Sequence, residues 1–392
     1  MDSRVGRVVI AAIAVLMIGS AVGCGEGAQE TTSDAQPVRI GAVLSLTGTY
    51  AALGEAEKNA LDLEVARIND AGGINGSPIE LLIEDDATDE AKAVAATSKL
   101  IEQDGVVALI GATGTGPTMA MRGDIQRAGI AQISLAGGTV VTGDFDPLVF
   151  QTPWSNNLVV PYVLEVMKES GHTKVALLTD SGGYGKDGRD VIIAEAPPAG
   201  IDIVADETFN PGDTDLTAQL TRMKGSGADA VLLWTAGKEA AIAMKSARDL
   251  GMKLPLFGGS GQARAEFIEG SEGAAEGFVF GTGKSLIPSN WGEGSPEYQS
   301  VSDFATRYEA AYGEAPDIFA GHAFDALAIV ADALERAGTD ASPAQLRDAI
   351  EATSGLAGFG GSFTFSAEDH NGLTREDLAT YRIEGGKWVA AE

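Results

Sequence analysis

The sequence predicts an α/β protein built on two doubly wound parallel sheets. Short β-rich runs alternate with helix-like segments from Val38 onward, and the same alternation starts again at Lys174. Alternating strands and helices are typical of a parallel sheet with helices on both faces. The length of 392 residues allows two such units, each with a sizeable core.

Four strands are expected in the first unit, at 38–44, 79–85, 106–111 and 130–135. After the first of these, Leu53, Leu61 and Ile68 mark an apolar face at helical spacing. Further helices are expected at 90–103 and between the last two strands. Each strand is thus followed by a helix, as a parallel sheet requires.

The second unit repeats the pattern. Strands are expected at 174–180, 201–206, 229–235 and 255–259, with helices at 186–196, 215–224 and 238–250. Two longer helices are expected at 297–312 and 317–337, and strands at 361–366 and 378–390, where Gly385-Gly386 favours a hairpin turn. Two doubly wound units predict a ligand site in the crevice between them, at the carboxyl ends of their strands.

Composition excludes several functions. The net charge of −29 disfavours nucleic-acid binding, which depends on Lys and Arg. A single cysteine and three scattered histidines exclude an internal disulfide and disfavour a metal site. No G-x-S-x-G elbow or Cys-His pair is present, so we expect neither catalytic residues nor a cofactor. The acidic run 84–90 lacks the spacing of a calcium loop and reads as a strand-to-helix turn.

The N-terminus predicts export. Arg4 and Arg7 precede an apolar run at 8–18, which is too short for a comfortable membrane span and is typical of a signal peptide over 1–23. Residues 21–24, Ala-Val-Gly-Cys, resemble a bacterial lipobox, although Leu is commoner at the first position. The resemblance implies a lipid on Cys24 that anchors the protein to the outer face of the membrane through a polar tether, 24–37. The alternative is an ordinary signal peptide with an incidental cysteine.

Five stretches carry a family resemblance: 40–54, 68–101, 106–118, 180–187 and 213–233. The most characteristic is the second, INDAGGINGSPIELLIEDDATDEAKAVAATSKLI. Together they resemble the type I periplasmic binding fold, specifically the Leu/Ile/Val-binding protein family of ABC-transporter receptors. The resemblance implies two lobes that close around a ligand, with three hinge crossings near Pro153, Thr282 and Ser354. The implied lobes are 38–152 plus 283–354, and 153–282 plus 355–392.

The loop GATGTGPT (111–118) is the main candidate site. A phosphate loop would have Lys and then Ser or Thr after the last glycine, but Pro117 and Thr118 stand there. A helix N-terminus with nearby hydroxyls also suits a carboxylate. The resemblance implies that Thr115 holds the ligand carboxylate, with Thr113 or Gly114 as its neighbour. The alternative is that these threonines only cap the helix.

The resemblance implies further ligand contacts. A second loop would offer Gly137, Gly138 and Thr139, and Tyr184 would cover the ligand from the other lobe. Trp154 and Leu53 are weaker candidates, since either could serve only in packing. For any of the loop glycines, the alternative is a plain turn.

Two positions depart from the family pattern. Ser260 stands where branched-chain amino-acid binders have an acid that pairs with the ligand ammonium, and a neutral hydroxyl cannot replace it. Ala236 or Gly237 stands at an aromatic position. Either another acid binds the ammonium, or the ligand is a branched or aromatic acid without an amino group.

The expected function is that of a monomeric, lipid-anchored substrate-binding protein that delivers a small carboxylate ligand to ABC permease subunits. No cofactor and no nucleic acid are expected, and the membrane is contacted through the lipid alone. The alternative is a ligand sensor of the same fold that acts on a signalling receptor.

Overall fold

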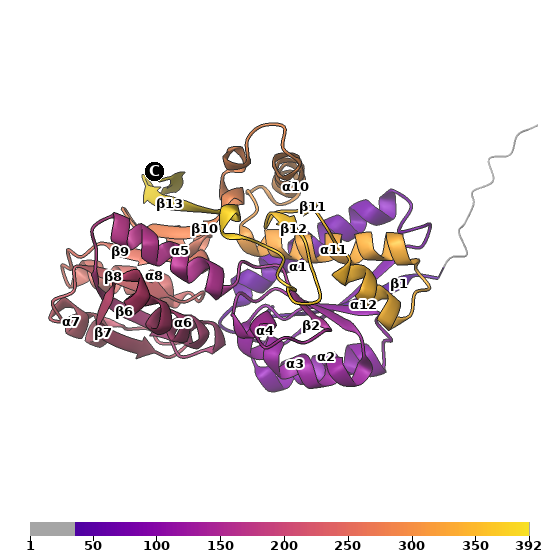
Figure 1. Ribbon diagram of the computed structural model, residues 1–392, viewed down its shortest axis with the longest axis horizontal. Coiled ribbons are helices and arrows are strands. Elements are labelled where there is room, and N and C mark those ends of the chain that lie inside the picture. The colour runs from indigo at the N-terminus through magenta and orange to yellow at the C-terminus, as the bar shows by residue number, and fades with distance from the viewer. Residues whose placement is uncertain (1–35, 392) are drawn as a thin grey trace, which may run out of the picture. The chain divides into compact units, whose positions relative to one another are not determined.

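The computed structural model describes residues 36–391, so the predicted leader, Cys24 and most of the tether lie outside the described residues. Two separate sheets, one of five strands and one of seven, confirm the predicted α/β class (Figure 1). Over residues 36–391, no helix combines the length and apolar character needed to cross a membrane.

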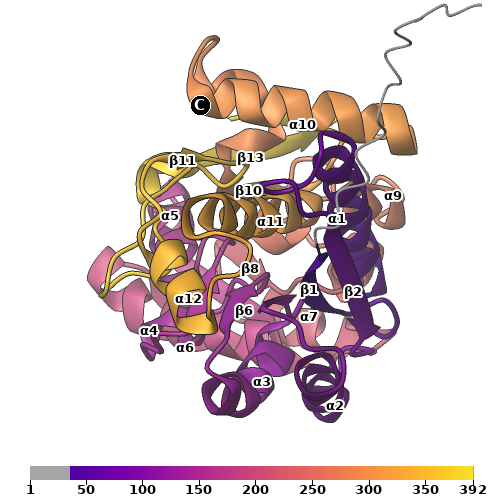
Figure 2. The same ribbon diagram turned by 90° about the vertical axis from the view of Figure 1, so that its right-hand side faces the viewer.

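The first sheet is wholly parallel, in the order β2-β1-β3-β4-β5. Its strands are β1 (Val38–Leu44), β2 (Ile79–Asp85), β3 (Ala108–Gly111), β4 (Ala131–Ser134) and β5 (Val149–Gln151). Helices α1 (Ala51–Asp70) and α11 (Ile318–Ala337) cover one face, and α2 (Glu90–Glu102) and α3 (Thr115–Ala128) cover the other (Figure 2). The three residues of β5 are too few for the sequence pattern to have shown a strand.

The second sheet has the order β14-β13-β10-β9-β8-β6-β7. Its strands are β6 (Lys174–Asp180), β7 (Asp202–Phe209), β8 (Ala230–Trp234), β9 (Leu256–Gly258), β10 (Val279–Gly283), β13 (Leu378–Glu384) and β14 (Lys387–Ala390). The first five pair in parallel, while β13 and β14 form the expected antiparallel hairpin. Gly385 and Gly386 make its turn with positive φ of 59° and 74°, a conformation that favours glycine.

The helices of this half are α5 (Asn156–Glu169), α6 (Gly183–Ala199), α7 (Thr217–Lys224), α8 (Glu239–Asp249) and α9 (Ala265–Gly270). The remaining elements are α4 (Val140–Gly143), α10 (Pro296–Tyr312), α12 (Pro343–Glu351), β11 (Leu356–Ala357) and β12 (Ser362–Phe363). The strand expected over 361–366 is much shorter than predicted. The reason is that Thr364 and Phe365 donate their backbone N–H groups to Gly372 and Thr353, outside any strand.

Trp154 joins the three segments through which the chain passes between the sheets. It lies just after β5, and its Nε1 donates to the Gly360 carbonyl oxygen at 2.8 Å. Gly283, at the end of β10, packs so closely that a Cβ there would lie 1.8 Å from the Trp154 ring. The three connections therefore all meet at one buried side chain, the indole of Trp154.

Asp325, a buried acid on α11, fixes the third connection. Its carboxylate oxygens accept the backbone N–H groups of Phe359 and Gly360, the latter at 2.7 Å. Burial raises its pKa to about 8, although these hydrogen bonds lower it. The carboxyl group is therefore protonated in the folded protein over a pH range in which it is ionised in the unfolded chain.

We expect stability to fall as the pH rises from about 4 to about 8, because folding takes up a proton at Asp325 in that window. Asp325→Asn cannot titrate, so the slope of unfolding free energy against pH should flatten by up to about 1.4 kcal/mol per pH unit. Urea unfolding across this window measures the slope. Asp332→Asn, at an exposed position of the same helix, is the control and should keep the wild-type slope. Equal slopes for Asp325→Asn and the control would contradict the assignment.

Candidate functional site

A cavity lies where the carboxyl ends of both sheets meet, as the doubly wound pattern predicts. Its lining residues follow β1, β3 and β4 of the first sheet and β6, β8 and β9 of the second, with one wall from α11. They are Tyr50, Leu53, Thr113, Gly114, Thr115, Leu135, Gly137, Pro153, Trp154, Tyr184, Ala236, Ser260, Gly261, Ile318, Phe319 and His322. The volume open to the centres of water molecules is about 40 Å³, which is room for a few waters.

Thr115 begins α3 at one end of the cavity. Its Oγ1 is buried and has no hydrogen-bond partner among residues 36–391. The N-cap, Gly114, makes no side-chain cap, and the backbone N–H of Thr115 at the start of α3 remains available to a ligand. A Cβ on Gly114 would lie 3.0 Å from the Tyr50 ring, which explains why a glycine occupies this position.

Thr113 differs from Thr115, because its hydroxyl is already engaged. Its Oγ1 accepts the backbone N–H of Ser45 at 3.0 Å and donates to the carboxyl group of Glu57. Glu57 is fully buried on α1, and burial raises its pKa well above the usual value. Sequence reasoning missed this acid, although its spacing of four from both Leu53 and Leu61 places it on the apolar face of α1.

The loop after β4 is only partly in the cavity. Gly137 lines it, whereas Gly138 and Thr139 do not. A Cβ on Gly138 would lie 2.5 Å from the Thr115 side chain, so this glycine makes room for Thr115. Thr139 donates its backbone N–H to Asp187 at 2.7 Å. Gly138 and Thr139 thus support the site from behind its wall.

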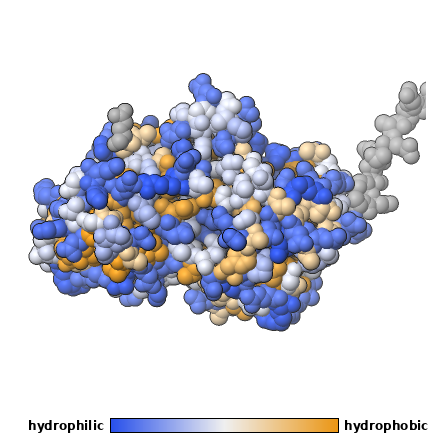
Figure 3. All heavy atoms as spheres, viewed as in Figure 1, coloured by the Kyte–Doolittle hydropathy of each residue, from blue (hydrophilic) through white to orange (hydrophobic). Residues whose placement is uncertain are grey.

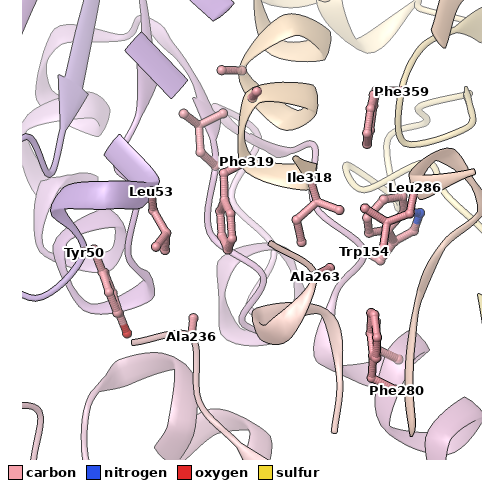
Figure 4. Close-up of a cluster of buried hydrophobic side chains, with 14 of the residues drawn as sticks. Tyr50, Leu53, Trp154, Ala236, Ala263, Phe280, Leu286, Ile318, Phe319 and Phe359 are labelled. Carbon is pink, nitrogen blue, oxygen red and sulfur yellow. The ribbon is translucent and has the colours of Figure 1, made fainter. Parts of the chain in front are cut away.

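The second sheet supplies Tyr184, Ala236 and Ser260. The Tyr184 ring stacks on Trp234, with ring centres 6.3 Å apart, and burial raises the pKa of its hydroxyl. Tyr50, from the opposite side of the cavity, directs its hydroxyl toward Ala236 (Figure 4). The Ser260 Oγ is buried without a partner in the described chain.

Helix α11 forms a wall that sequence reasoning missed. In the close-up view, Phe319 lies beside Leu53, and Ile318 lies between Phe319 and Trp154 (Figure 4). His322 follows one turn later, with its ring edge-on to Trp154 at 5.0 Å. Burial lowers the His322 pKa to about 3, so the imidazole is neutral, and its Nδ1 has no partner within residues 36–391. A single histidine in an apolar helix gave no sign of this position.

Comparison with known proteins decides the family. The chain matches the periplasmic binding protein family over residues 37–387. It belongs to that family. Its relatives are of the Leu/Ile/Val-binding kind: it is 26% identical to Leu/Ile/Val-binding protein homolog 3 of Brucella melitensis, over 91% of this chain and 94% of the relative.

Solved structures agree with this assignment. The branched-chain amino-acid transporter substrate-binding protein LivJ of Streptococcus pneumoniae, in complex with isoleucine, is 30% identical, with a TM-score of 0.81 over 91% of this chain and 99% of that one. An ABC-transporter solute-binding protein of Rhodopseudomonas palustris, in complex with benzoate, is 25% identical, with a TM-score of 0.80 over 90% of this chain and 95% of that one. The type I periplasmic binding fold is therefore confirmed.

This periplasmic binding protein holds its two sheets together beside the cavity through Asp187 on α6. Its carboxylate accepts the backbone N–H groups of Thr139 at 2.7 Å and Val140 at 3.2 Å, and Nδ2 of Asn156 at 2.7 Å. Nearby, a Cβ on Gly183 would lie 2.6 Å from the backbone nitrogen of Gly116. The loops of the two halves thus meet directly over the site.

Proposed function

We propose that this protein is an extracytoplasmic substrate-binding lipoprotein that delivers a small carboxylate ligand to an ABC permease. The observation that carries the proposal is the unpartnered Oγ1 of Thr115 at the start of α3, inside a cavity with apolar walls. A carboxylate would accept hydrogen bonds from this hydroxyl and from the Thr115 backbone N–H, at a helix N-terminus that favours an anion.

The ligands of two structural neighbours support the carboxylate. LivJ was solved with isoleucine and the R. palustris protein with benzoate. Isoleucine and benzoate differ in charge, shape and aromaticity but share a carboxylate. The walls here are lined by Leu53, Trp154, Phe319 and other apolar side chains, which suit a branched or aromatic body.

Lobe closure is the proposed mechanism. The proposed lobes are 38–152 plus 283–354, and 153–282 plus 355–392, with the ligand contacted from both sides only when they close. A ligand then favours the closed form by the difference between its affinities for the two states. The Asp187 contacts add to closure without touching the ligand.

A thermal-shift panel tests the proposal. The purified protein is heated with amino acids, oxo acids, aromatic acids, amides and sugars. Binding to the folded state alone raises the melting temperature as RT ln(1 + [L]/Kd). We expect a shift from at least one carboxylate and none from the amide of the same compound. A shift confined to amides or sugars would contradict the proposal.

The lipid anchor is proposed for Cys24, outside the described residues. Metabolic labelling with radioactive palmitate in a bacterial host should label the wild-type protein, and Cys24→Ser should remove the label. Export of an unlabelled wild-type protein would instead indicate an ordinary signal peptide.

We propose that the protein is a monomer, because few large hydrophobic side chains are exposed on the described surface. The large hydrophobic side chains exposed over residues 36–391 are Val140 and Phe145, in and just after α4, Ile193 on α6 and Tyr312 at the end of α10. On the face shown in Figure 3, hydrophilic side chains predominate. Stable dimers usually bury a larger apolar patch.

A further inference from the structure

We infer that the cavity selects carboxylates that carry no ammonium group, such as oxo acids and aromatic acids, over the amino acids. This inference rests on the proposed carboxylate function and narrows its ligand class. A buried ammonium has three donors and a full charge, and burial is costly unless an acid or several acceptors surround it.

No Asp or Glu is present among the described residues that line the cavity. Three buried acids near the lining residues are each bonded through one carboxyl oxygen. Glu57 accepts the Thr113 hydroxyl. Asp180 accepts the Gly182 N–H at 2.8 Å, and Glu239 accepts the Gly212 N–H at 2.6 Å. The second oxygens of Glu57 and Asp180 are buried without a partner in the described chain, but none of the three acids lines the cavity.

The backbone acceptor expected in the second loop is also engaged. The carbonyl oxygen of Gly137 accepts the Asn156 N–H at 2.9 Å, at the start of α5. It could accept one more hydrogen bond, but a single carbonyl does not replace a carboxylate for a buried cation. The cavity therefore lacks the acceptors that an ammonium requires.

The unpartnered polar side-chain atoms of the described lining residues are neutral. Beside the Thr115 hydroxyl, Ser260 presents an unpartnered hydroxyl, and His322 presents an uncharged ring with an unpartnered Nδ1. A hydroxyl can donate to an oxo oxygen or accept from a hydroxyl group. These two groups suit a ligand that is neutral apart from its carboxylate.

The test compares two ligands that differ at one group: leucine, and 4-methyl-2-oxopentanoate, which has an oxygen in place of the amino group. Benzoate serves as a third ligand. Isothermal titration calorimetry should show the oxo acid or benzoate binding at least about 100-fold more tightly than leucine. Binding of leucine as tightly as the oxo acid and benzoate would overturn the inference.

Ser260→Asp provides a gain-of-function test. The new carboxylate should raise the affinity for leucine at least about tenfold, because it attracts the ammonium group. It should lower the affinity for the oxo acid, because it repels a second anion. Ser260→Asn is the matched control, with nearly the same size and no charge, and should keep the wild-type order of ligands. Equal effects of Asp and Asn would contradict a charge-based selection.

The same data separate this inference from the proposed function. If only amino acids bind, the ammonium inference fails while the carboxylate function stands. If no carboxylate binds at all, the proposed function itself fails. The wild-type comparison decides between these outcomes even if Ser260→Asp does not fold.

Discussion

Thr115→Val is expected to weaken carboxylate binding roughly 10- to 100-fold, the usual loss for a hydrogen bond to a charged group. Valine has the shape of threonine without the hydroxyl, so the wall of the cavity is kept. The free protein should be as stable as the wild type or slightly more stable, because the buried Oγ1 has no partner in the described chain. Calorimetry with the best carboxylate from the panel measures the affinity.

Thr139→Val is the matched control. The Thr139 hydroxyl is also buried without a partner in the part of the chain that the structure describes, but Thr139 does not line the cavity. We therefore expect the affinity of the Thr139→Val protein for the carboxylate to stay within about threefold of the wild-type value. A larger loss at Thr139 than at Thr115 would place the carboxylate in the second loop and contradict the account of α3.

Asp187→Ala is expected to shift the protein toward an open form and to weaken the binding of every ligand by roughly 100-fold or more. The carboxylate accepts two backbone N–H groups, those of Thr139 and Val140, from the opposite half, and each charged hydrogen bond is worth about 1.5–3 kcal/mol. Because Asp187 does not line the cavity, the loss should be the same for the oxo acid and for benzoate. Small-angle scattering should show a larger radius of gyration for the variant at the same ligand concentration.

Asp190→Ala on the same helix is the control. Asp190 pairs with Lys186 and Arg189, both on its own helix, α6. It should leave both affinity and scattering unchanged. A loss for Asp187→Ala that depends strongly on the ligand would instead indicate direct contact with it.

The sequence was sufficient for most strands of the two large sheets, because they are apolar runs bounded by breaks, but it did not reveal β5. The expected strands at 38–44 and 79–85 coincide with β1 and β2. The strand predicted over 361–366 was too long. Its alternating pattern is typical of a strand, but its later N–H groups bond to loops. Local pattern does not reveal which partner a backbone group finds across the chain.

Lining residues were easiest to predict where a loop follows a strand. Thr115, Tyr184 and Ser260 each lie just beyond a strand and line the cavity. Tyr50 lies in the loop after β1 but was not predicted, and His322 was not found because it comes from a helix whose packing brings it to the cavity. Their identity as lining residues depends on tertiary contacts that a sequence motif does not contain.

The most direct test of the account is a crystal structure with the tightest-binding carboxylate from the panel. We predict one carboxylate oxygen within about 3 Å of the Thr115 Oγ1, with the body of the ligand between Leu53, Phe319 and Trp154. A ligand bound outside this cavity, or bound in it with its carboxylate directed away from α3, would contradict the account.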